Sequence, residues 1–395
     1  MPDLSLGPPD EGRFFGSGLF HGLLRLVRLD DNSAEGVRRR VAVIALLAWL
    51  PLLVLVAAQG HLLQGVAVPF VRDIETHVRL LVVIPLLLLA EVQALRFQPA
   101  VVQEFPRRGL VPAEAMPRFE AAVASSSRLR NSAWAEAALL VLVYAVFMGV
   151  IWRQYASTYA STWFATTTPA GTQLTLAGHW LVFVSLPIVQ FLVLRWYLWM
   201  LAWARFLWQV SRIRLTLAPT HPDRAGGLGF LESSGQIFLM VALAQGALAA
   251  GPLASLIVFK GAVLTQFVDV LTALVAWVAL VVYGPLLFFT PQLVVAKRVG
   301  LFEYGRLAER YVRQFHAKWL DDRAHPDEPL IGSADIQSLA DLGNAYNVVE
   351  GLRLAPISYV AVLRLAAVTL APVAPLLLTM VPLNELILRL FSIAL

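Results

Sequence analysis

The sequence contains no cysteine. This absence excludes disulfide bonds, thiol catalysis and cysteine metal sites, although it does not identify a compartment. Charge is also scarce, because only 14% of the 395 residues are Asp, Glu, Lys or Arg, against about 25% in soluble domains. A soluble fold with so few charges could not cover its surface. Lipid must therefore be the solvent for much of this chain.

Recognisable chemistry is missing as well. The sequence has no nucleophile–base pair, no carboxylate pair at a defined spacing and no histidine-rich stripe, so it predicts no catalytic residue, no metal site, no cofactor and no enzyme. The net charge of +5 does not indicate a nucleic-acid partner, because the basic residues lie beside apolar segments. No cleavable signal peptide is expected in the first forty residues, and the first span is expected to direct insertion.

Seven segments are apolar over the roughly 20 residues that are needed to cross about 30 Å of hydrocarbon. They are residues 41–59, 77–95, 133–152, 179–201, 236–259, 265–290 and 359–383. Backbone groups in lipid must bond within their own segment, so each is predicted to be a helix. The predicted fold class is an all-α polytopic membrane bundle of about seven transmembrane helices.

The distribution of basic residues predicts the orientation. With a cytoplasmic N-terminus, 24 of the 31 Lys and Arg lie in cytoplasmic segments, 4 lie outside and 3 lie within spans, as the positive-inside rule requires. Seven spans then place the C-terminus in the periplasm of a bacterial inner membrane, which the Ala-, Leu- and Arg-rich composition favours. Pro372, Pro375 and Pro382 could instead break the last span or make it re-entrant.

Two segments outside the spans have amphipathic patterns. In the N-terminal segment 1–40, a helix over Phe14–Leu29 is predicted to lie in the headgroup layer, or alternatively to pack on the bundle. Segment 292–358 predicts two helices that form a cytoplasmic hairpin. The expected inward-facing residues of the hairpin are Leu301, Tyr304, Ala308, Tyr311 and Phe315 on the first helix, and Leu339, Leu342, Tyr346 and Val349 on the second.

A glycine-rich stretch, THPDRAGGLGFLESSG, covers residues 220–235. Its candidate binding residues are His221, Asp223, Arg224, Gly226, Gly227 and Gly229. A glycine turn before a helix can bind an anion, but this one lacks the context of a P-loop or a dinucleotide fingerprint. The alternative is a tight turn that docks against the bundle, with Asp223 and Arg224 as an ion pair.

Four charges fall inside predicted spans, each near a cytoplasmic end: Glu91, Glu136, Arg195 and Arg364. Charges within spans are costly, so they mark candidate functional residues. One interpretation is a cavity open to the cytoplasm for an ion, a proton or an anionic solute. The alternative is a set of ion pairs between helices, with arginines that extend to the headgroups.

Aromatic residues cluster where the fourth span leaves the membrane. They are Trp196, Tyr197, Trp199, Trp203 and Trp208. Tryptophan and tyrosine favour that interface, so the sequence predicts an anchoring belt.

Two strings resemble a family of bacterial multi-pass inner-membrane proteins to which no activity is assigned. They are HPDRAGGLGFL and, at 332–353, GSADIQSLADLGNAYNVVEGLR. The resemblance covers roughly residues 215–357 and implies no functional residue.

Two functions are compatible with these observations. The first is a channel-like or transporter-like protein whose solute or ion enters through the four charges and the glycine turn. The second is a membrane anchor or sensor that acts through protein contacts of the hairpin. The expected partners are the lipid bilayer and a small solute or ion. A second copy of the chain remains an alternative, and no nucleic acid is expected.

Overall fold

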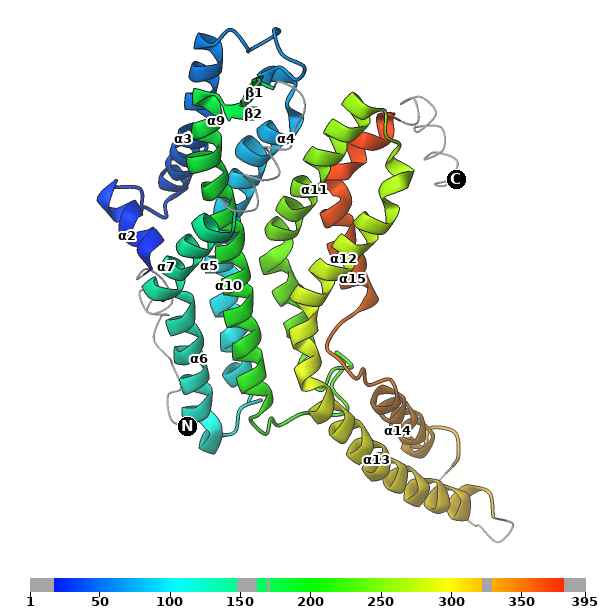
Figure 1. Ribbon diagram of the computed structural model, residues 1–395. Coiled ribbons are helices and arrows are strands. Elements are labelled where there is room, and N and C mark those ends of the chain that lie inside the picture. Colours follow the sequence, from blue (N-terminus) through cyan, green and yellow to red (C-terminus); the bar gives the residue numbers. More distant parts are fainter. Residues whose placement is uncertain (1–17, 148–161, 169–170, 322–328, 380–395) are drawn as a thin grey trace.

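The computed structural model describes residues 18–147, 162–168, 171–321 and 329–379. In these residues it is an all-α bundle, apart from one small β-hairpin (Figure 1). Six helical runs are long and apolar enough to cross a membrane, which confirms a multi-pass membrane protein. They are Ala34–Ala58, Ile74–Arg107, Leu176–Ser211, Gly229–Lys260, Leu264–Trp319 and Tyr359–Thr379.

The predicted span 133–152 is described only in part. It begins as α7 (Ala133–Leu142) and widens into a π-helical turn, Val143–Phe147. Residues 148–152 lie outside the described residues. Ser132 starts α7 by accepting a hydrogen bond from the Ala135 N–H, as an N-cap serine is expected to do.

The remaining α-helices overlap the predicted segments, but the runs Ile74–Arg107 and Leu176–Ser211 extend well past the predicted ends at residues 95 and 201. On the N-terminal side they are α2 (Leu19–Leu26), α3 (Ala34–Ala58), α4 (Ile74–His77), α5 (Ile84–Arg107), α6 (Met116–Arg130), α9 (Leu176–Trp180) and α10 (Leu186–Ser211). On the C-terminal side they are α11 (Leu239–Lys260), α12 (Val268–Tyr283), α13 (Thr290–Trp319), α14 (Ala334–Glu350) and α15 (Tyr359–Leu370). Strands β1 (Ala165–Thr168) and β2 (Gly171–Leu174) pair antiparallel.

Several helices change pitch where proline interrupts them. Pro285 lies in the 3₁₀ stretch η8 (Gly284–Phe289), between α12 and α13. Another 3₁₀ stretch, η9 (Ala371–Thr379), follows α15 and contains Pro372 and Pro375. Proline removes one backbone donor and clashes with the preceding turn, which accounts for both changes. The last predicted span is therefore helical, but it changes from an α-helix to a narrower 3₁₀ helix after Leu370. Its residues 380–383 lie outside the described part.

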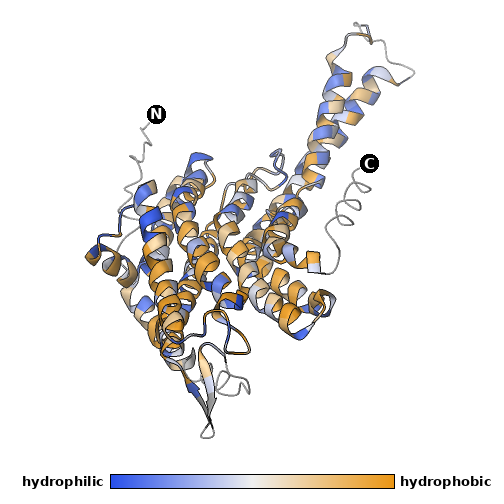
Figure 2. Ribbon diagram, turned by 90° about the horizontal axis from the view of Figure 1, so that it is seen from above, coloured by the Kyte–Doolittle hydropathy of each residue, from blue (hydrophilic) through white to orange (hydrophobic). Residues whose placement is uncertain are grey.

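The helices form two neighbouring groups (Figure 1). One contains α2, α3, α5, α6, α7 and α10, and the other contains α11, α12 and α15. Gly246 brings α11 against the Thr369 carbonyl in the last turn of α15, where a Cβ atom would have no room. Small residues allow this close backbone approach between helices in lipid. Hydrophobic residues predominate along the helices of the bundle (Figure 2).

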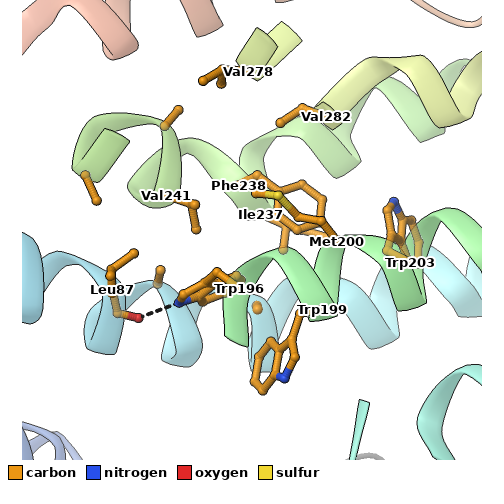
Figure 3. Packing of buried hydrophobic residues seen from close by; sticks show 14 of the residues in the cluster. Leu87, Trp196, Trp199, Met200, Trp203, Ile237, Phe238, Val241, Val278 and Val282 are labelled. Atoms are coloured by element: carbon orange, nitrogen blue, oxygen red, sulfur yellow. Dashed lines mark hydrogen bonds between the residues drawn. The ribbon is translucent and has the colours of Figure 1, made fainter. Parts of the chain in front are cut away.

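The predicted tryptophan belt is wrong for three of its members. Trp196, Trp199 and Trp203 are buried, and only Trp208 is well exposed. Figure 3 shows Trp196 against α5, with its indole N–H donating to the Leu87 carbonyl at 3.0 Å. Hydropathy reports how deep a residue lies along a helix, but it does not report which side of the helix faces lipid.

The hairpin prediction is confirmed by the pattern of exposure. Every inward residue predicted on α13 and α14 is partly or fully covered, and the residues between them are mostly exposed. Only Leu293 and Gly300 of α13 are fully buried, so the rest of the helix stands out from the bundle (Figures 1 and 2). The Tyr311 hydroxyl and the Trp319 indole N–H hold the far end by donating to Asp335.

Helix α2 combines both interpretations of the N-terminal segment. Leu23 and Leu26 face outward, and Leu26 is 82% exposed, as expected for a helix in the headgroup layer. His21 and Leu24 instead point into the bundle and are buried. Residues 14–17 of the predicted helix lie outside the described residues.

Candidate functional site

Three of the four charges predicted within spans meet inside the bundle. Glu91 comes from α5, Glu136 from the first turn of α7, and Arg195 from the middle of α10. All three are almost completely buried. We call these three residues, together with His21 of α2, the arginine clamp.

Arg195 makes a complete set of directed contacts in the clamp. Its two terminal nitrogens, Nη1 and Nη2, donate to the two oxygens of Glu91, each at 3.2 Å. Its Nε donates to Glu136 Oε1 at 2.9 Å. This is the paired-fork geometry that makes arginine–carboxylate contacts strong and specific. One cation thus joins three membrane helices.

Glu136 also fixes the start of helix α2. The backbone N–H of Phe20 donates to Glu136 Oε2 at 2.9 Å. Gly18, the residue before the helix, offers no capping side chain. A Cβ atom at Gly18 would lie within 3 Å of the Glu136 carboxylate. A carboxylate from another helix therefore satisfies a free N–H that a capping side chain would normally bind.

His21 of α2 contacts both Arg195 and Glu91 in the clamp. Its Nδ1 lies 3.4 Å from Arg195 Nη2, and its Nε2 lies 3.5 Å from Glu91 Oε1. Arginine can only donate, so Nδ1 accepts and the neutral ring carries its proton on Nε2. Burial lowers the pKa of His21, although Glu91 opposes the change. Its environment favours the neutral ring.

Aromatic rings surround the guanidinium of Arg195. It lies 4.7 Å from the Phe20 ring centre and 4.6 Å from that of Trp199. A second buried arginine, Arg130, lies over the same Trp199 ring at 5.3 Å, and burial lowers its pKa to about 10. Such cation–π contacts stabilise arginine where water is absent. The sequence pointed to none of Arg130, Phe20 or His21 as members of this site.

Arg364 does not join the clamp. It lies on α15, in the other group of helices (Figure 1). There it lines a cavity of about 180 Å³ together with Glu232 and Tyr283. Gly229, from the predicted glycine turn, borders the same cavity. The sequence placed Arg364 at the right depth, but it could not indicate which neighbour it faces.

The glycine turn holds an anion, but that anion is the side chain of Asp223. Its Oδ1 accepts from the N–H groups of Ala225, at 2.8 Å, and Gly227, at 3.2 Å. Its Oδ2 accepts from the Gly229 N–H at 2.8 Å. Burial disfavours the charged carboxylate, but these hydrogen bonds outweigh burial and lower the pKa of Asp223. The nest of N–H groups is therefore filled from within the chain.

The turn is also tied to the hairpin. The Arg353 guanidinium donates to the Asp223 carbonyl at 2.9 Å, and the Arg353 N–H donates to the Arg224 carbonyl at 2.8 Å. Arg224 and Gly226 have positive φ angles. No ion pair joins Arg224 to Asp223 among the described contacts, and His221 is the residue beside Asp223, at 2.9 Å. The predicted docking role of the turn agrees with this geometry.

Within the described residues, no group of three or more His, Asp or Glu is placed to hold a metal ion. The clamp is saturated by its own contacts. Its geometry positions helices, and it offers no free carboxylate oxygen for general acid–base chemistry.

No family model matches the chain, and comparisons with curated proteins and with solved structures also find no match. The resemblance to a bacterial membrane family therefore remains a prediction.

Replacing Arg195 with leucine should destabilise the protein by about 3–5 kcal/mol, because two buried carboxylates lose their common partner. Thermal unfolding in detergent would measure this. Adding Glu91→Gln and Glu136→Gln to Arg195→Leu should restore part of the loss. The control is Arg205→Leu, an exposed position on the same helix, with an expected change within about 0.5 kcal/mol. A triple variant no more stable than Arg195→Leu would contradict the clamp.

The variant Asp223→Asn should lower stability at neutral pH by about 1–3 kcal/mol, because an amide leaves at least one N–H of the turn without an acceptor. The advantage of the native carboxylate is fully present above the ordinary aspartate pKa of about 3.9. It disappears as the pH falls through the lowered pKa of the folded state. The stabilities of both proteins should therefore begin to converge below about pH 4 and become similar once the pH is below the folded-state pKa of Asp223. The exposed Asp341→Asn is the control, and a gap that persists in acid would exclude this role.

Proposed function

We propose that the protein is a membrane-anchored docking or sensing module that acts through its cytoplasmic hairpin, α13–α14. The observation that carries this proposal is an apolar, partly basic surface at the base of the hairpin. Val295, Val299 and Phe302 are exposed along one side of α13, and Phe302 is 69% exposed. Exposed apolar patches on otherwise polar segments mark interaction sites.

A groove adjoins this exposed side. It has a volume of about 490 Å³ and is lined by Val294, Leu301, Phe302, Tyr346 and Leu354, with Lys297 and Arg298 beside them. We call it the root groove. Lys297 donates to the Leu352 carbonyl at 3.2 Å, which holds the two sides of the groove together. An apolar floor with two cations suits an apolar protein segment that carries acidic residues.

The rigidity of the hairpin supports a role in presenting this groove. Helical structure continues from Leu264 through the sixth span to Trp319, so α13 has no flexible joint with the membrane. Gly300 packs α13 against Pro219 and Val349, where a Cβ atom would lie within 3 Å of both. A movement of the membrane helices would therefore be transmitted to the groove.

The proposed orientation places the hairpin in the cytoplasm of a bacterial cell, with the N-terminus inside and the C-terminus in the periplasm. The excess of Lys and Arg on this side supports it. The chain has no cysteine, so single cysteines can report the side. We expect Gln173→Cys to react with an impermeant maleimide in intact cells, and Ile331→Cys to react only after lysis. The opposite pattern would remove the basis for a cytoplasmic partner.

Site-specific photocrosslinking tests the docking role in the full-length protein in its own membrane. A photoreactive residue at Phe302 should form one discrete protein adduct, and the crosslinked peptide should be apolar with acidic neighbours. Arg298→Glu should weaken this adduct several-fold by charge repulsion. The control position is Val312 on the same helix, which is 49% exposed and outside the groove. Adducts with lipid alone, or equal protein adducts at both positions, would refute the proposal.

Transport of a small solute or ion is the second candidate. The cavity between Gly229 and Arg364 favours it, because this cavity joins one of the four charges to the glycine turn. The clamp does not favour it, because its three charges bind one another. Flux across liposomes that is lost in Arg364→Gln but kept in Arg205→Leu would favour transport. Absence of flux for any ion or solute tried would leave docking as the better explanation.

A further inference from the structure

The cavity beside Arg364 contains two opposite charges that do not pair with each other. Glu232 contributes a carboxylate from the 3₁₀ stretch η6 (Gly229–Phe238), and Arg364 contributes a guanidinium from α15. No ion pair joins them, and within the described part of the chain Arg364 has no hydrogen-bond or ion-pair partner. Arg364 is exposed, and exposed opposite charges gain little from pairing with each other, so its guanidinium is available to a molecule that enters the cavity.

Glu232 is held in place by contacts outside the cavity. Its Oε1 accepts from the Ser358 hydroxyl at 2.8 Å, and its Oε2 lies 3.4 Å from Arg353 Nη1. Two fixed donors prevent the carboxylate from swinging toward Arg364. The carboxylate thus remains on one wall of the cavity, where its ion pair with Arg353 offsets part of its charge.

The other walls of the cavity are rigid and mixed in polarity. The Tyr283 hydroxyl donates to the Ala361 carbonyl at 3.3 Å, and it packs so closely on Gly235 that a Cβ atom there would not fit. Ser233 and Gln236 add polar groups. The volume of about 180 Å³ corresponds to about six water molecules at ~30 Å³ each. This volume suits a compact polar group and excludes a bulky one.

We infer that this cavity binds a compact zwitterion in which a primary ammonium group and a phosphate are a few atoms apart. The phosphate would bind Arg364, whose guanidinium matches the geometry of phosphate oxygens. The ammonium would donate to Glu232. Arg364 would repel a simple cation, and a simple anion would bind Arg364 but make no contact with the Glu232 carboxylate.

The position of the cavity suggests where such a group would come from. Tyr359 and Leu363 lie within five residues of Arg364 on α15 and are strongly exposed, Tyr359 by 78%. Exposed apolar residues on a membrane helix face lipid. An aminoalkyl phosphate could therefore arrive as a lipid headgroup or as a free molecule from the cytoplasm. The inference concerns this binding site alone and does not depend on the docking role of the hairpin.

Native mass spectrometry of the full-length protein tests the lipid source. The protein is titrated with phosphatidylethanolamine, with phosphatidylglycerol, which lacks the ammonium, and with phosphatidylcholine, whose ammonium cannot donate a hydrogen bond. We expect phosphatidylethanolamine to bind best. Arg364→Gln should weaken it by about tenfold or more, since a charged hydrogen-bonded contact is lost. Arg205→Gln, which removes an exposed arginine on α10 away from this cavity, should leave the affinity unchanged.

A second variant and a second probe complete the test. Glu232→Gln can still accept from Ser358, and it should reverse the preference in favour of phosphatidylglycerol. Free O-phosphoethanolamine is titrated in parallel. If it binds and Arg364→Gln abolishes binding, the source is a soluble molecule. If only the lipid binds in this way, the source is the membrane. The inference is overturned if neither phosphatidylethanolamine nor O-phosphoethanolamine binds, if phosphatidylethanolamine and phosphatidylglycerol bind equally, or if Arg364→Gln and Arg205→Gln have the same effect.

Discussion

The cost of placing charge in lipid determines how this bundle is arranged. Arg195 can lie inside the membrane only because Glu91 and Glu136 supply three hydrogen-bonded contacts from two other helices. Helices in lipid gain no hydrophobic driving force from contact with one another, so directed polar contacts and close packing must fix their relative positions. The arginine clamp fixes α5, α7 and α10 in this way, and α2 docks on the result.

Much of the fold could be predicted from composition and periodicity. Hydropathy located the spans because lipid thickness sets a minimum apolar length, and the 3.6-residue period identified the inner faces of α13 and α14. Both signals concern one helix at a time. They fail where the outcome depends on a neighbour, as with Trp196, Trp199 and Trp203, which the sequence assigned to the interface and which are buried in the core.

The candidate site illustrates the same limit. The sequence placed Glu91, Glu136, Arg195 and Arg364 at similar depth, and depth is a property of one helix. The first three meet and the fourth faces a different cavity, because rotation about the helix axis and the order of helices in the bundle decide the partners. The sequence offered the glycine turn either as an anion site or as a docking turn, and the local pattern could not indicate that Asp223 itself would supply the anion.

The capping of α2 by Glu136, which comes from another helix, has a consequence for how the protein is assembled in the membrane. The chain is synthesised from its N-terminus, yet His21 contacts Arg195, which is 174 residues later in the sequence, and the Phe20 N–H is bound by Glu136. Helix α2 emerges long before either partner exists. Its outward leucines allow it to wait in the headgroup layer. A helix that is synthesised early can thus reach its final place only after α7 and α10 are in position, so its docking comes late in the assembly of this half of the bundle.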